Sequence, residues 1–169
     1  MKIHVLDTGA LLSTWTQKNP DLFFVTTPSI LAELQNRPSK QRADNLIMTG
    51  RLSLETPFEN LISQVKEAAL EAGDASVLSA TDLEIIALGL TKKVSGATVV
   101  IVSTDLALLN TAANLNLGII DPNEKMKQKI SWIMRCPACG HVEHQARSEI
   151  ECPVCGTDML RKPDKRHTL

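Results

Sequence analysis

The first 121 residues alternate between short apolar runs and longer segments with helical periodicity. The apolar runs have the length and β-branched content of buried strands, and they lie at 3–6, 23–25, 98–103 and 118–120, with a minor candidate at 53–55. Helical spacing follows Pro28 and Pro57, begins again after a cap at Ser79 or Thr81 and runs to 93, and returns at 105–115. Buried strands separated by helices predict an α/β fold, in which helices cover both faces of a parallel sheet.

The pattern changes after residue 121. A polar, lysine-rich stretch begins there, typical of a linker or a short exposed helix. All four cysteines follow within a segment that is too short to hold itself together by a hydrophobic core alone. We therefore expect a main domain at 1–121, a basic linker at 122–131, a small β unit at 132–162 and a basic tail at 163–169.

The composition is that of an ordinary globular protein. Of 169 residues, 43% are hydrophobic and 22% are charged, which excludes a disordered chain, a collagen-like fibre and a coiled-coil rod. No apolar run approaches the ~18 residues of a membrane span. The N-terminal residues lack the pattern of a signal peptide. We expect a cytoplasmic protein with no membrane partner.

Charge is distributed unevenly although the net charge is only −1. Residues 1–120 carry 9 basic and 12 acidic side chains, whereas 121–169 carry 9 and 7. The chain has 3 Phe, 2 Trp and no Tyr, which argues against a platform that stacks successive bases on aromatic rings. Any contact with RNA should therefore depend mainly on charge and shape.

The cysteines form two Cys-Pro-x-Cys-Gly motifs separated by twelve residues. Two thiolates on one tight turn can face the same ion, and two such turns complete a tetrahedral zinc shell. The predicted ligands of one structural Zn²⁺ are Cys136, Cys139, Cys152 and Cys155. The alternatives are two disulfides or unrelated buried cysteines, and a reducing cytosol disfavours the first. His141 and His144 are expected to be exposed or to contact RNA, since four thiolates already satisfy the ion.

Basic residues flank the cysteine motifs on both sides. They fit either a solvated linker and tail or a rim that contacts RNA phosphates without reading sequence. The candidate RNA contacts are Lys127, Lys129, Arg135, Arg161, Lys162 and Arg166, with Lys125 and Lys165 beside them.

Four acids stand where an α/β sheet builds its ligand sites. Asp7 and Asp105 follow predicted strands, and ligands bind beyond the carboxyl ends of strands in open parallel sheets. Glu33 lies on the helix after the second strand, and Asp82 lies in the first turn of a later helix. Each also has a purely structural interpretation, as a helix cap, a favourable charge at a helix start or a surface residue.

Together these acids resemble the signature of the PIN-domain nucleases. The PIN-like part followed by paired Cys-x2-Cys motifs resembles the archaeal Nin-one-binding family of small-subunit ribosome maturation. The stretches 78–82, 102–105 and 132–136 carry this resemblance. It implies a three-layer α/β/α PIN-like fold followed by a small β zinc ribbon.

The resemblance implies an endoribonuclease that matures the 3′ end of small-subunit (16S-type) ribosomal RNA within the precursor particle, beside its assembly factors. Clustered carboxylates repel one another until cations neutralise them, and all-oxygen shells suit Mg²⁺ or Mn²⁺. We expect Asp7 and Asp105 to be primary ligands, Asp82 a direct or water-mediated ligand, and Glu33 a ligand of a second ion or a water-positioning group. Thr8 and Thr104 are candidates for orienting these carboxylates.

Two other functions are compatible with the same residues. One is a PIN and zinc-ribbon adaptor that has lost catalysis and binds RNA or the ribosome. The presence of all four acids argues against it. The other is a toxin-type PIN ribonuclease, which is expected to match only the N-terminal part of the chain.

Overall fold

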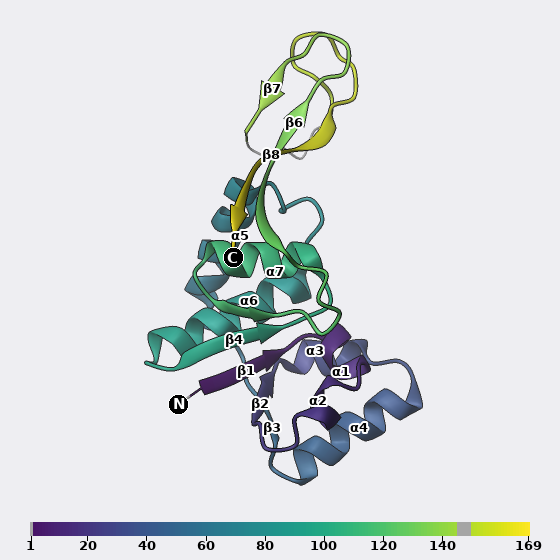
Figure 1. Ribbon diagram of the computed structural model, residues 1–169, viewed down its shortest axis with the longest axis vertical. Helices are drawn as coiled ribbons and strands as arrows, with labels where there is room; N and C mark the ends of the chain where they lie inside the picture. Colours follow the sequence, from purple (N-terminus) through teal and green to yellow (C-terminus); the bar gives the residue numbers. More distant parts are fainter. Residues whose placement is uncertain (1, 145–149) are drawn as a thin grey trace.

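Five parallel strands form the centre of the main domain in the computed structural model, which describes residues 2–144 and 150–169 (Figure 1). These strands are β1 (Lys2–Leu6), β2 (Phe24–Thr26), β3 (Leu52–Leu54), β4 (Thr98–Val102) and β5 (Gly118–Ile120). Their order across the sheet is β3-β2-β1-β4-β5, and every neighbouring pair is parallel. The predicted parallel α/β sheet is confirmed.

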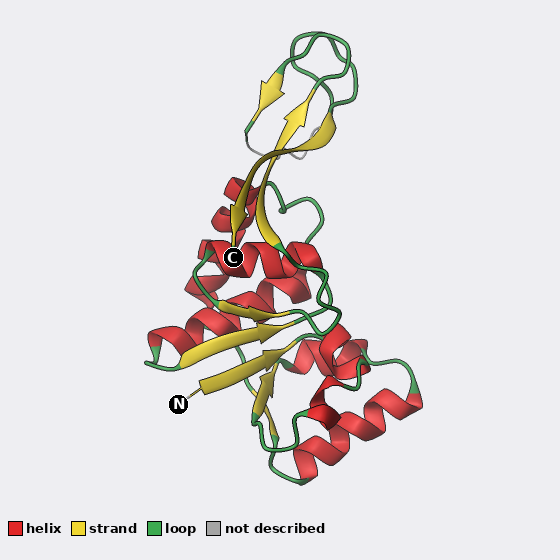
Figure 2. Cartoon of the chain, viewed as in Figure 1, coloured by secondary structure: helices red, strands yellow, loops and turns green. Residues whose placement is uncertain are grey.

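Helices cover this sheet on both faces (Figure 2). They are α1 (Thr8–Leu12), α2 (Trp15–Lys18), α3 (Pro28–Glu33), α4 (Arg37–Met48), α5 (Glu59–Ala72), α6 (Ala80–Val94) and α7 (Leu106–Asn114). In the described part of the chain, no helix has the length and apolar character to cross a membrane.

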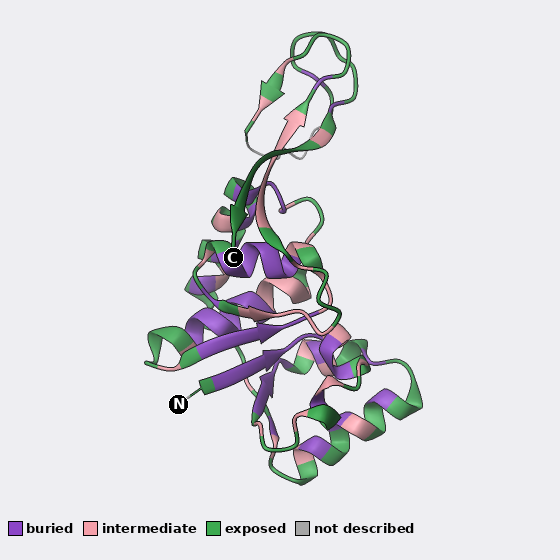
Figure 3. Cartoon of the chain, viewed as in Figure 1, coloured by how far each residue is buried: buried purple, intermediate pink, exposed green. Residues whose placement is uncertain are grey.

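The hydrophobic core lies between the sheet and its helices (Figure 3). Four of the five residues in β1 and in β4 are buried, because each strand has helices over both faces. The segment 85–91 of α6 is buried without interruption, since this helix packs against β1 and β4. The central strands are therefore held firmly, and so are the residues that follow them.

The helices differ from the prediction at two places. The segment after Pro28 is two helices, because Asn36 caps a new helix by accepting a hydrogen bond from the Ser39 N–H, and Pro38 stands in its first turn, where its missing N–H is not needed. The helices α1 and α2 were not predicted. They have 5 and 4 residues, too few to show a helical period.

The C-terminal ribbon is an antiparallel sheet in the order β7-β6-β8. Its strands are β6 (Gln128–Arg135), β7 (Val142–Glu143) and β8 (Leu160–Thr168). The strands β6 and β8 pair along their full length, with one irregularity between Ser131 and Trp132. Residues 128–131 of the expected linker and 163–168 of the expected tail are therefore strand residues. The polar sequence of β8 gave no strand signal, and its pairing with β6 creates the strand.

A buried polar network joins the ribbon to the main domain. Asp74, which is fully buried, accepts hydrogen bonds from Asn110 Nδ2 (2.6 Å) and Thr111 Oγ1 (3.3 Å) and forms an ion pair with Arg161 of β8. Asn110 also donates to the Ile130 carbonyl and accepts from the Ile130 N–H, both at 2.7 Å. We call these residues the docking network. Burial raises the pKa of Asp74, while Asn110, Arg161 and Thr111 lower it.

Gly73 lets the ribbon approach the end of α5 closely. It ends the helix in the left-handed conformation, with φ at 75°, and a Cβ there would lie 2.7 Å from the Trp132 carbonyl oxygen. Its own carbonyl accepts from Arg161 Nε at 2.9 Å. The Arg161 guanidinium lies 4.1 Å from the centroid of the Trp132 ring. Arg161 therefore pairs with the buried Asp74, donates to the Gly73 carbonyl at the end of α5 and stacks on the Trp132 ring.

We predict that Asp74→Ala destabilises the protein by about 3 kcal/mol, because it leaves Arg161 and Asn110 without their buried acceptor. Urea unfolding of the zinc-loaded protein, followed by circular dichroism, measures this. Asp164→Ala, on exposed β8, is the control and should change stability by less than about 0.5 kcal/mol. A loss below about 1 kcal/mol for Asp74→Ala would contradict a structural role for the network.

Candidate functional site

The carboxyl ends of β1 and β4 lie side by side at the switch point of the sheet. From β1 the strand order runs outward through β2 and β3 on one side and through β4 and β5 on the other. The register pairs Leu6 with Val102, and the Asp7 N–H continues the ladder by donating to the Val102 carbonyl at 3.1 Å. Asp7 and Ser103, the residues that follow these strands, therefore lie at the edge of the sheet where open α/β sheets bind ligands.

Ser103 connects the two aspartates that leave these strands. Its hydroxyl donates to Asp7 Oδ2 at 2.6 Å and accepts from the Asp105 N–H at 2.9 Å. Asp105 Oδ1 accepts from the Ala107 and Leu108 N–H groups and so caps α7. One fully buried hydroxyl thus bonds to the Asp7 carboxylate and to the backbone N–H of Asp105, the two predicted primary ligands.

Asp7 is a buried carboxylate with competing influences on its charge. Burial raises the pKa of this side chain, whereas hydrogen bonds from Ser103 and from the Thr8 N–H lower it. The neighbouring Asp82 carboxylate raises it again. Burial therefore makes the charged form of Asp7 costly, and a bound cation would offset that cost.

Glu33 and Asp82 lie at the periphery of this pair. Glu33 is exposed, and its Oε2 accepts from the Thr8 hydroxyl at 2.7 Å. The Thr8 N–H donates to Asp7 Oδ1, so Thr8 contacts both carboxylates, and its role in orienting them stays a prediction. Asp82 completes a capping box with Ser79, whose N–H and hydroxyl both donate to Asp82 Oδ2 at 2.7 Å.

Thr104 lies against the first turn of α1. A Cβ on Gly9 would come within 2.1 Å of Thr104 Oγ1 and 3.5 Å of Asp7 Oδ2, so a larger residue there would displace this side chain. The sequence pattern did not single out Gly9, because the contact joins segments far apart in the chain. Ser103 lies within the stretch 102–105 that carries the family resemblance, and its hydrogen bonds join Asp7 to the backbone of Asp105.

Three of the four acids stand at helix starts. Asp7 caps α1, Asp105 caps α7 and Asp82 lies in the first turn of α6, so the structural interpretation of each has a real contact behind it. Among the described residues, only the cysteines bring three or more metal-ligating side chains within 4.8 Å of one another. The acids line the edge of the sheet without closing on one point. Their donor set is all oxygen, which fits a hard cation such as Mg²⁺ or Mn²⁺.

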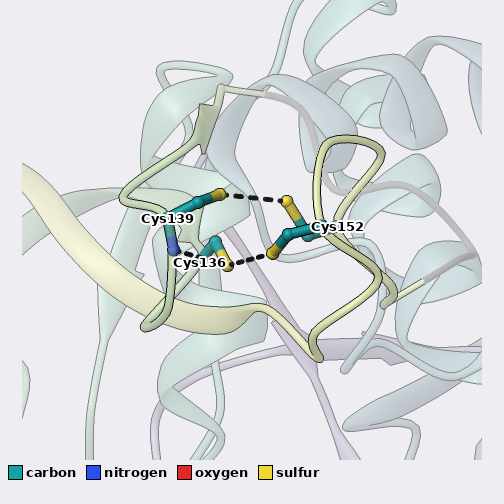
Figure 4. A group of neighbouring side chains, drawn as sticks. Cys136, Cys139 and Cys152 are labelled. Atoms are coloured by element: carbon teal, nitrogen blue, oxygen red, sulfur yellow. Dashed lines mark hydrogen bonds between the residues drawn. The ribbon is translucent and has the colours of Figure 1, made fainter.

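The four cysteines form a compact cluster at the far end of the ribbon (Figure 4). Their sulfur atoms all lie within 4.8 Å, with Cys136 Sγ 3.4 Å from Cys155 Sγ and Cys139 Sγ 3.6 Å from Cys152 Sγ. Such spacing suits four thiolates around one tetrahedral Zn²⁺. The cluster contains no histidine. A closed sulfur shell has no place for a substrate, so this site is structural.

The six predicted RNA-contacting cations do not share one surface. Arg161 is taken up by the docking network. Lys127 and Arg166 line a cavity between the ribbon and the main domain. Lys129, Arg135 and Lys162 lie on the opposite side of the ribbon, because paired residues of antiparallel strands point to the same side and successive residues alternate.

That opposite side, which we call the outer face, carries the basic side chains Lys129, Arg135, Lys162 and Lys165 among polar and apolar ones. Its pairs are Lys129 with His167, Ser131 with Lys165, Ile133 with Lys162 and Arg135 with Leu160. The inner pairs include Ile130 with Arg166 and Met134 with Arg161, which face the main domain. Sequence alone could not separate these sets, since the register depends on the irregularity between Ser131 and Trp132.

Comparison with known proteins gives a consistent result. Residues 4–91, half of the chain, match the family described as the PIN domain of ribonuclease. The chain is 29% identical over 163 residues to the endoribonuclease Nob1 of Archaeoglobus fulgidus, covering 95% of this chain and 90% of that protein. It is 40% identical over 65 residues to the 20S-pre-rRNA D-site endonuclease of Saccharomyces cerevisiae, covering 38% of this chain and 14% of that protein.

A relative of another kind aligns as extensively. The chain is 30% identical over 169 residues to ribonuclease VapC1 of Thermoplasma acidophilum, covering 99% of this chain and 81% of that protein. This corrects the expectation that toxin-type relatives match only the N-terminal part. The alignment with this relative therefore extends over the ribbon segment of this chain.

We predict that Asp7→Asn stabilises the zinc-loaded protein by about 1 kcal/mol at pH 7 when Mg²⁺ and Mn²⁺ are absent. Asparagine keeps the cap of α1 and removes a charge that burial makes costly. The folded state holds the Asp7 proton more tightly than the unfolded state does. The wild type therefore loses stability as the pH rises from 3.8 through the folded pKa of Asp7. The stability difference between Asp7→Asn and the wild type should disappear as the pH falls toward 3.8.

Thermal melting at pH 7 and near pH 4 measures this difference, with exposed Asp44→Asn as the control. Added Mn²⁺ should raise the melting temperature of the wild type more than that of Asp7→Asn. If Asp7→Asn is less stable than the wild type at both pH values, Asp7 is a structural cap and not a strained ligand.

Proposed function

This chain belongs to the PIN-domain ribonucleases, and on that premise we propose that it is a metal-dependent endoribonuclease that matures the 3′ end of small-subunit ribosomal RNA. The observation that carries the proposal is the pairing of Asp7 and Asp105 around Ser103 at the switch point of the sheet. A binding module would not need a buried carboxylate at this position, since burial makes the charged form of Asp7 costly until a cation offsets that cost.

The acids have separate roles in this proposal. Asp7 and Asp105 hold the catalytic Mg²⁺ or Mn²⁺, Asp82 supports it directly or through water, and Glu33 holds a second ion or positions the attacking water. When bound, such an ion lowers the pKa of water and stabilises the charge that develops on the phosphate and the leaving oxygen. Ser103 fixes the Asp7 carboxylate, and Thr8 fixes the Glu33 carboxylate. The protein thereby prepares the oxygen ligands before substrate arrives.

The ribosomal substrate rests on relatives. The Archaeoglobus relative is named an endoribonuclease, and it aligns with this chain over nearly the whole length of both proteins. The yeast relative is named for a pre-rRNA site. The ribbon supports the same substrate class, because its outer face presents lysine and arginine side chains to phosphates. The proposed partners are the precursor RNA, the precursor small subunit and its assembly factors.

A second candidate is a ribonuclease of the VapC kind that acts on another RNA. The alignment of the Thermoplasma relative along 99% of this chain favours it. Both candidates share the acid site and differ only in the RNA that they select. Substrate choice therefore separates them, while the metal site does not.

The test is cleavage of a precursor RNA that spans the 3′ end of small-subunit rRNA, beside an unrelated structured RNA of equal length, with Mn²⁺. We predict a single cut at the mature 3′ end. Asp105→Asn should lower the rate more than about 100-fold and leave RNA affinity nearly unchanged, because the change removes a ligand charge and keeps the α7 cap. Exposed Asp21→Asn is the matched control.

Three outcomes would contradict the proposal in different ways. Equal cleavage of both RNAs would favour the general ribonuclease. Tight binding of the precursor without cleavage in any divalent metal would favour the adaptor that lacks catalysis. Activity of Asp105→Asn within tenfold of the wild type would remove Asp105 from the metal site.

The outer face should make RNA binding dependent on salt. We predict that changing Lys129, Lys162 and Lys165 to Gln flattens the slope of log K against log salt by about 0.7 for each single-strand phosphate that the protein no longer neutralises. The matched control changes the exposed lysines Lys18, Lys40 and Lys66 of the main domain. An unchanged slope for the ribbon variant would show that these side chains are merely solvated.

A further inference from the structure

A cavity of about 400 Å³ lies where the ribbon meets the main domain. Ala107, Met126 and Trp132 contribute to its apolar wall, and Lys125, Lys127 and Arg166 add positive charge. The size falls in the range of small-ligand sites, in which apolar walls combine with a few polar groups. The acid site described above does not include this cavity.

The cavity begins where the acid site ends. Ala107 lies in the first turn of α7, and its N–H donates to Asp105 Oδ1 at 2.7 Å. The wall of the cavity and the proposed metal ligand are therefore parts of one helix start. A strand of RNA with its phosphate at Asp105 would have its neighbouring nucleotide beside Ala107.

Some charged side chains that line the cavity are paired with one another, and others have no ion-pair partner among the described residues. Arg161 and Asp74 also line it, but they neutralise each other, and the amide of Asn110 is occupied by Asp74 and Ile130. Within 2–144 and 150–169, no carboxylate forms an ion pair with Lys125, Lys127 or Arg166. These three cations are therefore available to an anion.

An apolar wall beside unpaired cations suits a ligand with a flat apolar part and a phosphate. We propose that the cavity binds one nucleotide of the RNA strand next to the bond that is cut, with the base against Met126 and Trp132 and the phosphate at the lysines. This inference rests on the proposed function and names a subsite for it. The Asp74 carboxylate and the Asn110 amide inside are already paired, and the proposed base contacts are apolar, so the site should accept purines and pyrimidines alike.

The first test measures nucleotide binding without catalysis. In a Trp15→Phe background Trp132 is the sole tryptophan, so its fluorescence reports on the cavity. Titration with AMP and with UMP should change this signal, and inorganic phosphate should bind more weakly than either. Ala107→Leu fills the cavity and should weaken nucleotide binding on the order of tenfold, because it displaces the base from its wall. Ala68→Leu, at a half-buried helical position away from the cavity, is the matched control.

The second test uses the cleavage assay. Ala107→Leu should raise the KM for RNA on the order of tenfold, since it fills the space that the nucleotide would occupy. Lys127→Gln adds no volume and should weaken AMP binding severalfold, so the inference remains testable if Ala107→Leu misfolds.

The outcomes separate this inference from the proposed function. A Trp132 signal that does not respond to millimolar AMP or UMP would overturn the nucleotide site, as would equal responses to nucleotides and inorganic phosphate. RNA cleavage with an unchanged KM in Ala107→Leu and in Lys127→Gln would also overturn it, while the ribonuclease proposal would stand. Nucleotide binding at the cavity without cleavage of any RNA would instead overturn the proposed function.

Discussion

The parallel pairing of β1 with β4 is the constraint on which the candidate site depends. Full register from Lys2 with Thr98 to Leu6 with Val102 brings the two strand ends to the same level, although they are nearly one hundred residues apart in the chain. Asp7 then receives the Ser103 hydroxyl, and Ser103 receives the Asp105 N–H. Because buried apolar residues hold both strands from either face, Asp7 cannot move into solvent to relieve the cost of its burial. The cation of the proposed metal site would relieve that cost.

In the proposed function, the ribbon adds RNA binding to this arrangement. Its far end depends on the cysteines for its fold, while its near end is fixed by Asp74 and Arg161 inside the protein. The docking network turns one side of β6 and β8 toward the main domain, and the outer face remains available to phosphates. Binding and cleavage of RNA are therefore assigned to different residues of one molecule.

The sequence predicted the strands, the fold class and the cysteine site because each leaves a local signal. Short helices such as α1 left none, and β8 became a strand only through its partner. The acids were found by their place after predicted strands, but the sequence could not separate cap from ligand, since Asp7 and Asp105 occupy positions suited to both. Arg161 was predicted to contact RNA. Its true partner, Asp74, lies 87 residues away and gave no local sign of being buried.

The central claim is that the acids at the switch point hold the catalytic cation. Crystals of the zinc-loaded protein grown with Mn²⁺, measured at the manganese and zinc absorption edges, test it most directly. The account predicts a manganese peak within about 2.0–2.4 Å of carboxylate oxygens of both Asp7 and Asp105, and one zinc peak among the four cysteines. A well-ordered site without manganese, in which Asp7 contacts only Ser103 and the start of α1, would contradict it.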